Sequence, residues 1–201
     1  MTVGTVPATV PFRVPWTTVG TAAAVAGLTT LLTATVPAWG DSTLTIRLVQ
    51  LALAASAAYL LDDAAATLTT VAPQSMRRHR ALPLVSGLVA VAISWTVVLL
   101  NLRMLPEATL RALTVEVAVL VLVTLAASAV LAMRGEPEPG NTVAVVVPLV
   151  GVGALLIGGM LGFDVFMGGL GSGMTGKAGA WAVMGGIAFA LIVWATRDKP
   201  A

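Results

Sequence analysis

Six uninterrupted apolar runs, each about 18 residues long or longer, constrain the fold of this chain more than any other feature. A helix needs about 20 residues to cross a bilayer core of about 30 Å, so every run is long enough to span it. The runs cover residues 17–36, 44–61, 81–100, 110–133, 142–163 and 178–195. Because they are continuous and do not alternate between apolar and polar residues, they predict helices and exclude a transmembrane barrel. We therefore predict an all-α, polytopic integral membrane protein with six transmembrane helices.

The composition supports this prediction and excludes several kinds of site. Hydrophobic residues make up 58% of the 201 residues and charged residues only 10%, which leaves too little polar surface for a soluble domain. With no cysteine and one histidine, the chain has neither a disulfide nor a Cys/His zinc site. A net charge of +2, spread over scattered basic residues, does not make a nucleic-acid surface. The lipid bilayer is the expected surrounding, with no metal and no nucleic acid bound.

The distribution of Lys and Arg predicts the orientation. With the N-terminus inside the cell, seven of these residues lie on the cytoplasmic side and four lie outside, which favours cytoplasmic positions for both termini. The inner set is Arg13, Arg77, Arg78, Arg80, Arg134, Arg197 and Lys199, and the outer set is Arg47, Arg103, Arg111 and Lys177. The excess of Arg over Lys and the abundant Ala are typical of a GC-rich bacterial genome, so we expect a multi-pass protein of the bacterial cytoplasmic membrane.

The chain divides into two parts. Pro7, Pro11 and Pro15 would each delete a helical hydrogen bond, so residues 1–16 are predicted to form an extended, proline-containing cytoplasmic tail. Residues 17–201 are predicted to form a single six-helix transmembrane domain.

The longest polar segment, residues 62–80, joins the second run to the third. Asp62 and Asp63 precede helix-forming residues up to Thr67, and Pro73 stops the run, which predicts a short helix along the inner membrane face. A basic cluster that resists translocation follows and keeps the segment in the cytoplasm. The cluster consists of Arg77, Arg78, His79 and Arg80.

The last third of the chain is rich in glycine, with 13 of the 20 glycines between residues 151 and 186. Gly158 and Gly162 stand four residues apart, which predicts a close approach of two helices. In residues 164–177, three apolar residues (165–167) follow Asp164, and the segment is too short to span the membrane. It is predicted to form a re-entrant hairpin on the outer side, between the fifth and sixth helices.

Two motif matches carry little weight. Residues 171–177, GSGMTGK, resemble a phosphate-binding loop, but Ala178 stands where a Ser or Thr would hold magnesium and no strand precedes the glycines. The adjacent Asp62 and Asp63 resemble part of an aspartate-rich metal site, but alanines follow where a third carboxylate would be needed. A helix cap is the favoured interpretation of the two acids.

Three charges lie nearest to the lipid: Glu116, Arg47 and Asp164. A carboxylate within a span costs about 2.5–3.5 kcal/mol on insertion scales, so Glu116 is predicted to face a helix partner or an aqueous path. Pairing with Arg47 or Arg111 near the outer surface is favoured over a role in binding substrate or protons. The sequence offers no paired catalytic residues, so we do not expect an enzyme.

The layout of the chain resembles the membrane subunits of bacterial ABC-type exporters with six-helix permeases. The resemblance lies in the topology, in residues 59–67 (YLLDDAAAT) and in residues 77–82 (RRHRAL). It implies that the segment 62–80 carries a coupling helix that docks on a separate ATPase subunit, which binds ATP and magnesium, and that the outer segment before the last helix is re-entrant. The chain departs from the family at its N-terminus, where prolines replace the usual interfacial helix.

The resemblance also implies a second copy of the chain, or a similar permease, because two six-helix halves enclose a translocation path. Two other functions stay open. One is an oligomeric secondary transporter or channel with Glu116 as its coupling acid and no ATPase. The other, a lipid-modifying membrane enzyme, is disfavoured by the lack of a catalytic set.

Overall fold

The computed structural model describes residues 16–35, 43–62, 76–103, 105–136, 138–161, 166 and 175–195. The side chains of residues 43, 76–83, 175 and 176 lie outside this description. The helices are α1 (Trp16–Thr35), α2 (Thr43–Ala58), the short 3-10 helix η2 (Tyr59–Leu61), α3 (Met76–Asn101), α4 (Glu107–Met133), α5 (Pro139–Leu161) and α6 (Thr175–Ala195). No strand occurs among the described residues.

Six of these helical stretches are long and apolar enough to cross a membrane, which confirms the predicted all-α architecture with six spans. Several of the helices begin a few residues before the predicted apolar runs, because polar residues ahead of these runs are also helical. Helix α4 begins at Glu107, directly after Pro106, whose φ of −55° suits a helix start. Helix α3 begins at Met76 and α5 at Pro139, both earlier than the apolar runs indicate.

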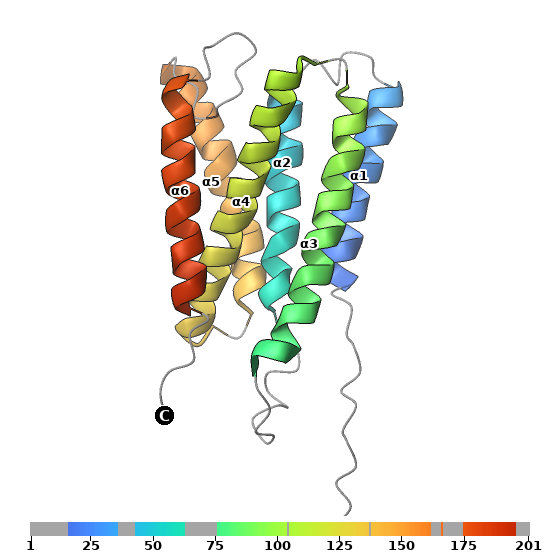
Figure 1. Cartoon of the computed structure of the whole chain (residues 1–201). Helices are drawn as coiled ribbons and strands as arrows, with labels where there is room; N and C mark the ends of the chain where they lie inside the picture. Colours follow the sequence, from blue (N-terminus) through green and yellow to red (C-terminus); the bar gives the residue numbers. More distant parts are fainter. Residues whose placement is uncertain are drawn as a thin grey trace, which may run out of the picture.

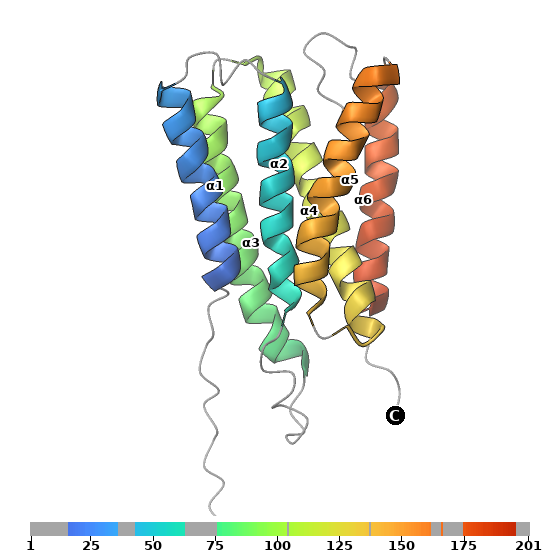
Figure 2. The same ribbon diagram turned by 180° about the vertical axis from the view of Figure 1, so that it is seen from behind.

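The helices run up and down the bundle, so α1 begins and α6 ends at the same end (Figure 1). Helix α2 lies in the middle, between α4, α5 and the α1–α3 pair, and α6 packs along α4 (Figures 1 and 2). Helices α2 and α4 are about half buried, whereas α5 and α6 expose apolar side chains such as Leu156, Met160 and Phe189. These outer faces suit contact with lipid.

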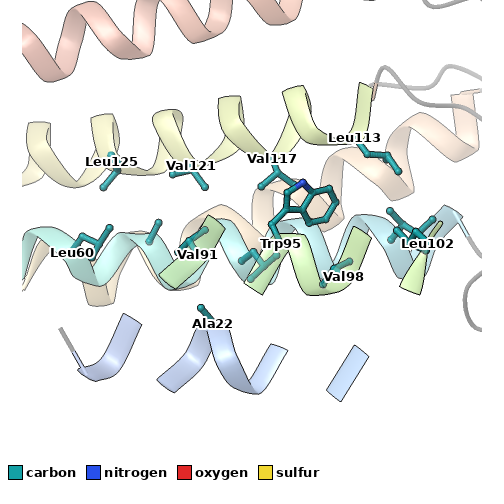
Figure 3. Packing of buried hydrophobic residues seen from close by; sticks show 13 residues of the cluster. Ala22, Leu60, Val91, Trp95, Val98, Leu102, Leu113, Val117, Val121 and Leu125 are labelled. Carbon is teal, nitrogen blue, oxygen red and sulfur yellow. The ribbon is translucent and has the colours of Figure 1, made fainter. Parts of the chain in front are cut away.

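The main apolar core lies where α1, α2, α3 and α4 meet (Figure 3). Val91, Trp95 and Val98 of α3 pack there with Val117 and other residues of α4. The Trp95 Nε1–H donates to Thr114 Oγ1 at 3.2 Å, which satisfies the polar edge of the ring.

Helices α2 and α5 approach closely through glycines. A Cβ atom on Gly140 would lie 2.7 Å from the Ala58 carbonyl oxygen, and one on Gly151 would lie 2.7 Å from Leu51 Cδ1. Gly158 is buried, whereas Gly162 lies outside the described residues, so the predicted Gly158–Gly162 packing pair stays a prediction. The predicted helix within residues 63–75 and the tail before residue 16 also lie outside them.

Candidate functional site

Arg47 of α2 and Glu116 of α4 form an ion pair inside the bundle, and both side chains are 0% exposed. Gln50, one turn after Arg47, joins them. Arg47 Nη1 donates to Gln50 Oε1 at 2.9 Å, and Gln50 Nε2 donates to Glu116 Oε2 and to the Leu113 carbonyl, each at 3.1 Å. In a medium of low dielectric such charges are tolerated only when they are paired and hydrogen-bonded, as they are here.

The other side of the Arg47 guanidinium faces an aromatic ring. Phe166 is only 3% exposed, and its ring centroid lies 4.5 Å from Arg47 Cζ, a cation–π contact. The same ring packs on Trp181 of α6 with 5.8 Å between centroids. Lys177 Nζ donates to the Phe166 carbonyl at 3.4 Å. The Phe166 ring therefore covers one side of the guanidinium, and Trp181 packs against that ring.

The sequence predicted that Glu116 pairs with either Arg47 or Arg111. In the structure Glu116 pairs with Arg47. Arg111 instead pairs with Glu107 at 2.5 Å in an exposed i,i+4 contact on the first turns of α4. Asp164 lies outside the described residues. Gln50, Phe166 and Trp181 were not predicted from the sequence. Gln50 does carry a signal, since it is a polar residue three positions after Arg47 within an apolar run.

At the opposite end of the bundle, Asp62 caps helix α5. The Gly140 N–H donates to Asp62 Oδ1 at 2.6 Å, and the Asn141 backbone amide also bonds to this carboxylate. The first amides of a helix have no acceptor within the helix. An acidic side chain at this position accepts hydrogen bonds from them and interacts favourably with the positive end of the helix dipole. The adjoining Ala58 carbonyl accepts a bond from Ser128 Oγ at 3.4 Å. Helices α2, α4 and α5 thus meet beside Asp62.

Burial raises the pKa of the Asp62 carboxyl above its ordinary value of 3.8. The bonds from Gly140 and Asn141 lower the pKa and the charge of Glu138 raises it, and the balance remains a raised pKa. The folded protein therefore holds this proton more tightly than the unfolded chain does.

We expect stability to fall as the pH rises from about 3.8 through the raised pKa of Asp62. Asp62→Asn, which cannot titrate, should make the free energy of unfolding less dependent on pH in this window. The measurement is the melting temperature of the purified protein in detergent at a series of pH values. Glu136→Gln is the control, because Glu136 is an exposed acid that lies just before the start of α5. A wild-type slope in the Asp62→Asn protein would contradict the assignment.

The remaining residues of the predicted coupling loop are only partly placed. Asp63 and Thr67 lie outside the described residues. Arg77, Arg78, His79 and Arg80 lie in the first turns of α3, and their side chains are not described. Among the described residues, no group of His, Cys, Asp or Glu is suited to hold a metal ion.

The arrangement offers two polar junctions within an apolar bundle. One is a neutralised charge cluster near the end where α2, α4 and α6 begin, and the other is the Asp62 cap near the end where α3 and α5 begin. Comparison of the chain with models of known protein families finds no match, and searches of curated proteins and of solved structures find none either.

Proposed function

We propose that this chain is the transmembrane permease subunit of a bacterial ATP-driven exporter of the ABC type. In this proposal the protein performs no chemistry itself. A separate ATPase subunit binds ATP and magnesium and docks on the segment 62–80. Two permease subunits, identical or similar, rock between inward-open and outward-open states in the cytoplasmic membrane.

The observation that carries the proposal is the start of α3. The helix begins at Met76, whereas the apolar run of the sequence begins at Ala81. The five residues before this run are helical and hold Arg77, Arg78 and Arg80, and at a rise of 1.5 Å per residue they extend about 7.5 Å beyond it. Figure 1 shows α3 extending past the other helices at this end. A projecting basic helix supports a protein contact at the membrane surface, where charges set the choice of partner.

The orientation of this proposal places both termini and the segment 62–80 in the cytoplasm. Residues 164–177 then form a re-entrant hairpin on the outer side. The deep burial of Phe166 against Arg47 and Trp181 supports it, because an ordinary solvated loop would not place an aromatic ring among buried helices.

We expect the double reversal Arg77→Glu/Arg78→Glu to abolish the association with the ATPase and leave membrane insertion intact. The measurement is the amount of ATPase that co-purifies with the tagged permease in mild detergent, which should fall at least about tenfold, or about 1.4 kcal/mol of binding free energy. Arg134→Glu is the matched control, because Arg134 is an exposed basic residue at the same end of the bundle.

The proposal is wrong if the wild-type chain, purified without an ATPase and placed in liposomes, dissipates a proton gradient, and if Glu116→Gln stops this activity but the arginine reversal does not. In that case the protein is a secondary transporter or channel. The complete burial of Glu116 against Arg47 fits such a role less well than the exporter proposal.

A further inference from the structure

Asp62 and Asp63 are adjacent in the sequence, but Asp62 already has a partner within the bundle. Its carboxylate caps the first turn of α5 through the Gly140 amide at 2.6 Å and through the Asn141 amide. A carboxylate engaged in this way is turned toward α5. It therefore belongs to the packing of the bundle, although it begins the segment proposed to dock on the ATPase.

The cap lies at one end of a close contact between α2 and α5. Gly140 and Gly151 are eleven residues apart, just over three whole turns, so they share one face of α5. Gly140 meets Ala58 and Asp62, and Gly151 meets Leu51, with distances that leave no room for a Cβ atom. These two contacts and the cap join α2 to α5. Because closely packed helices do not deform continuously, we expect the two helices to move together at this end.

We propose that Asp62 is a positioning residue that transmits movement from the segment 62–80 to α5. This inference rests on the proposed function and deepens it. When the ATPase displaces the segment, the Asp62 cap carries α5 along with the end of α2. The partner subunit is recognised by other residues of the segment, the basic start of α3 among them.

The first test uses the permease alone and needs no ATPase. The Gly140 amide precedes the hydrogen-bonded part of α5, so its protection from hydrogen exchange depends on Asp62. In lipid nanodiscs, Asp62→Ala should raise the exchange rate of the Gly140 and Asn141 amides about tenfold, equivalent to about 1.4 kcal/mol of protection. Asp62→Asn should stay near the wild type, because Asn also caps helices. Glu136→Gln is the control for a lost exposed acid. Unchanged exchange in Asp62→Ala would overturn the proposal.

The second test asks whether the cap transmits movement. Thr142 is exposed on α5, so Thr142→Cys places a single thiol in a chain without cysteine. With the co-purified ATPase, Mg-ATP should change the rate of its reaction with a charged maleimide at least about threefold, or about 0.65 kcal/mol. Asp62→Ala should abolish this change while the ATPase still co-purifies, and Asp62→Asn should preserve it.

The outcomes separate the two proposals. If Asp62→Ala or Asp62→Asn loses the ATPase itself, Asp62 is a docking charge and the inference is wrong. If the ATPase stays bound and the thiol still responds to Mg-ATP in Asp62→Ala, the transmission role is also wrong. If no ATPase co-purifies even with the wild type, the proposed function fails, and with it the transmission role, while faster amide exchange would still establish the cap.

Discussion

Glu116→Gln should lower the free energy of unfolding by about 3–5 kcal/mol. The substitution keeps the shape of the side chain but removes the charge that neutralises Arg47, and both residues are fully buried. Without a counter-charge, the free-energy cost of burying the guanidinium in a low-dielectric interior is largely uncompensated. The measurement is unfolding in mixed micelles with increasing SDS, followed by tryptophan fluorescence.

Two comparisons distinguish this effect from a general loss of charge. Glu107→Gln breaks the exposed pair with Arg111 and should cost about 0.5 kcal/mol or less. The double variant Arg47→Met/Glu116→Leu should recover most of the loss, since an apolar pair of similar volume has no charge to desolvate. A loss of about 1 kcal/mol or less for Glu116→Gln would mean that water reaches Arg47 in the folded protein.

Phe166→Ala should cost about 3–5 kcal/mol, the usual range for a buried aromatic residue. The ring fills the space between Arg47 and Trp181, so its removal leaves a cavity and uncovers the guanidinium. Phe166→Leu refills much of the volume but lacks the π face, so it should retain a deficit of about 1–2 kcal/mol. The same SDS titration measures both variants.

The control for Phe166 is Phe189→Ala on α6, because Phe189 is 59% exposed on the outer surface and its removal opens no internal cavity. Phe166 and Glu116 both act on Arg47, so their combined variant should lose less stability than the two single losses together. Strict additivity would show that the ring and the ion pair are independent, contrary to the contacts described above.

The sequence predicted the helices well because an apolar run of sufficient length has few other solutions in a bilayer. The ends of the helices were less predictable, because α4 begins at Glu107, directly after Pro106, and not at the start of the apolar run at residue 110. The partner of Glu116 was less certain, because Arg47 and Arg111 both lie near the same end of the bundle and the choice depends on how α2 and α4 face each other.

Phe166 and Trp181 were not predictable as parts of the charge cluster. Both are apolar residues in apolar surroundings, and only the fold brings them to Arg47. The local pattern favoured Asp62 as a cap for the residues that follow it, which lie outside the described residues, and it did not indicate the bond from Asp62 to the start of α5. Contacts of this type join positions 78 residues apart, and no local periodicity reports them.

The buried charge pair also has a consequence for the synthesis of the protein. Arg47 and its partner Glu116 are separated by 69 residues. At about 5–20 residues per second, α2 emerges from the ribosome about 3–14 s before Glu116 exists. During that interval Arg47 has no carboxylate to neutralise it, and a lone arginine opposes insertion into the lipid. We therefore expect α2 to stay at the insertion machinery or near the membrane surface until α4 arrives, and the two helices to enter the bilayer as a pair.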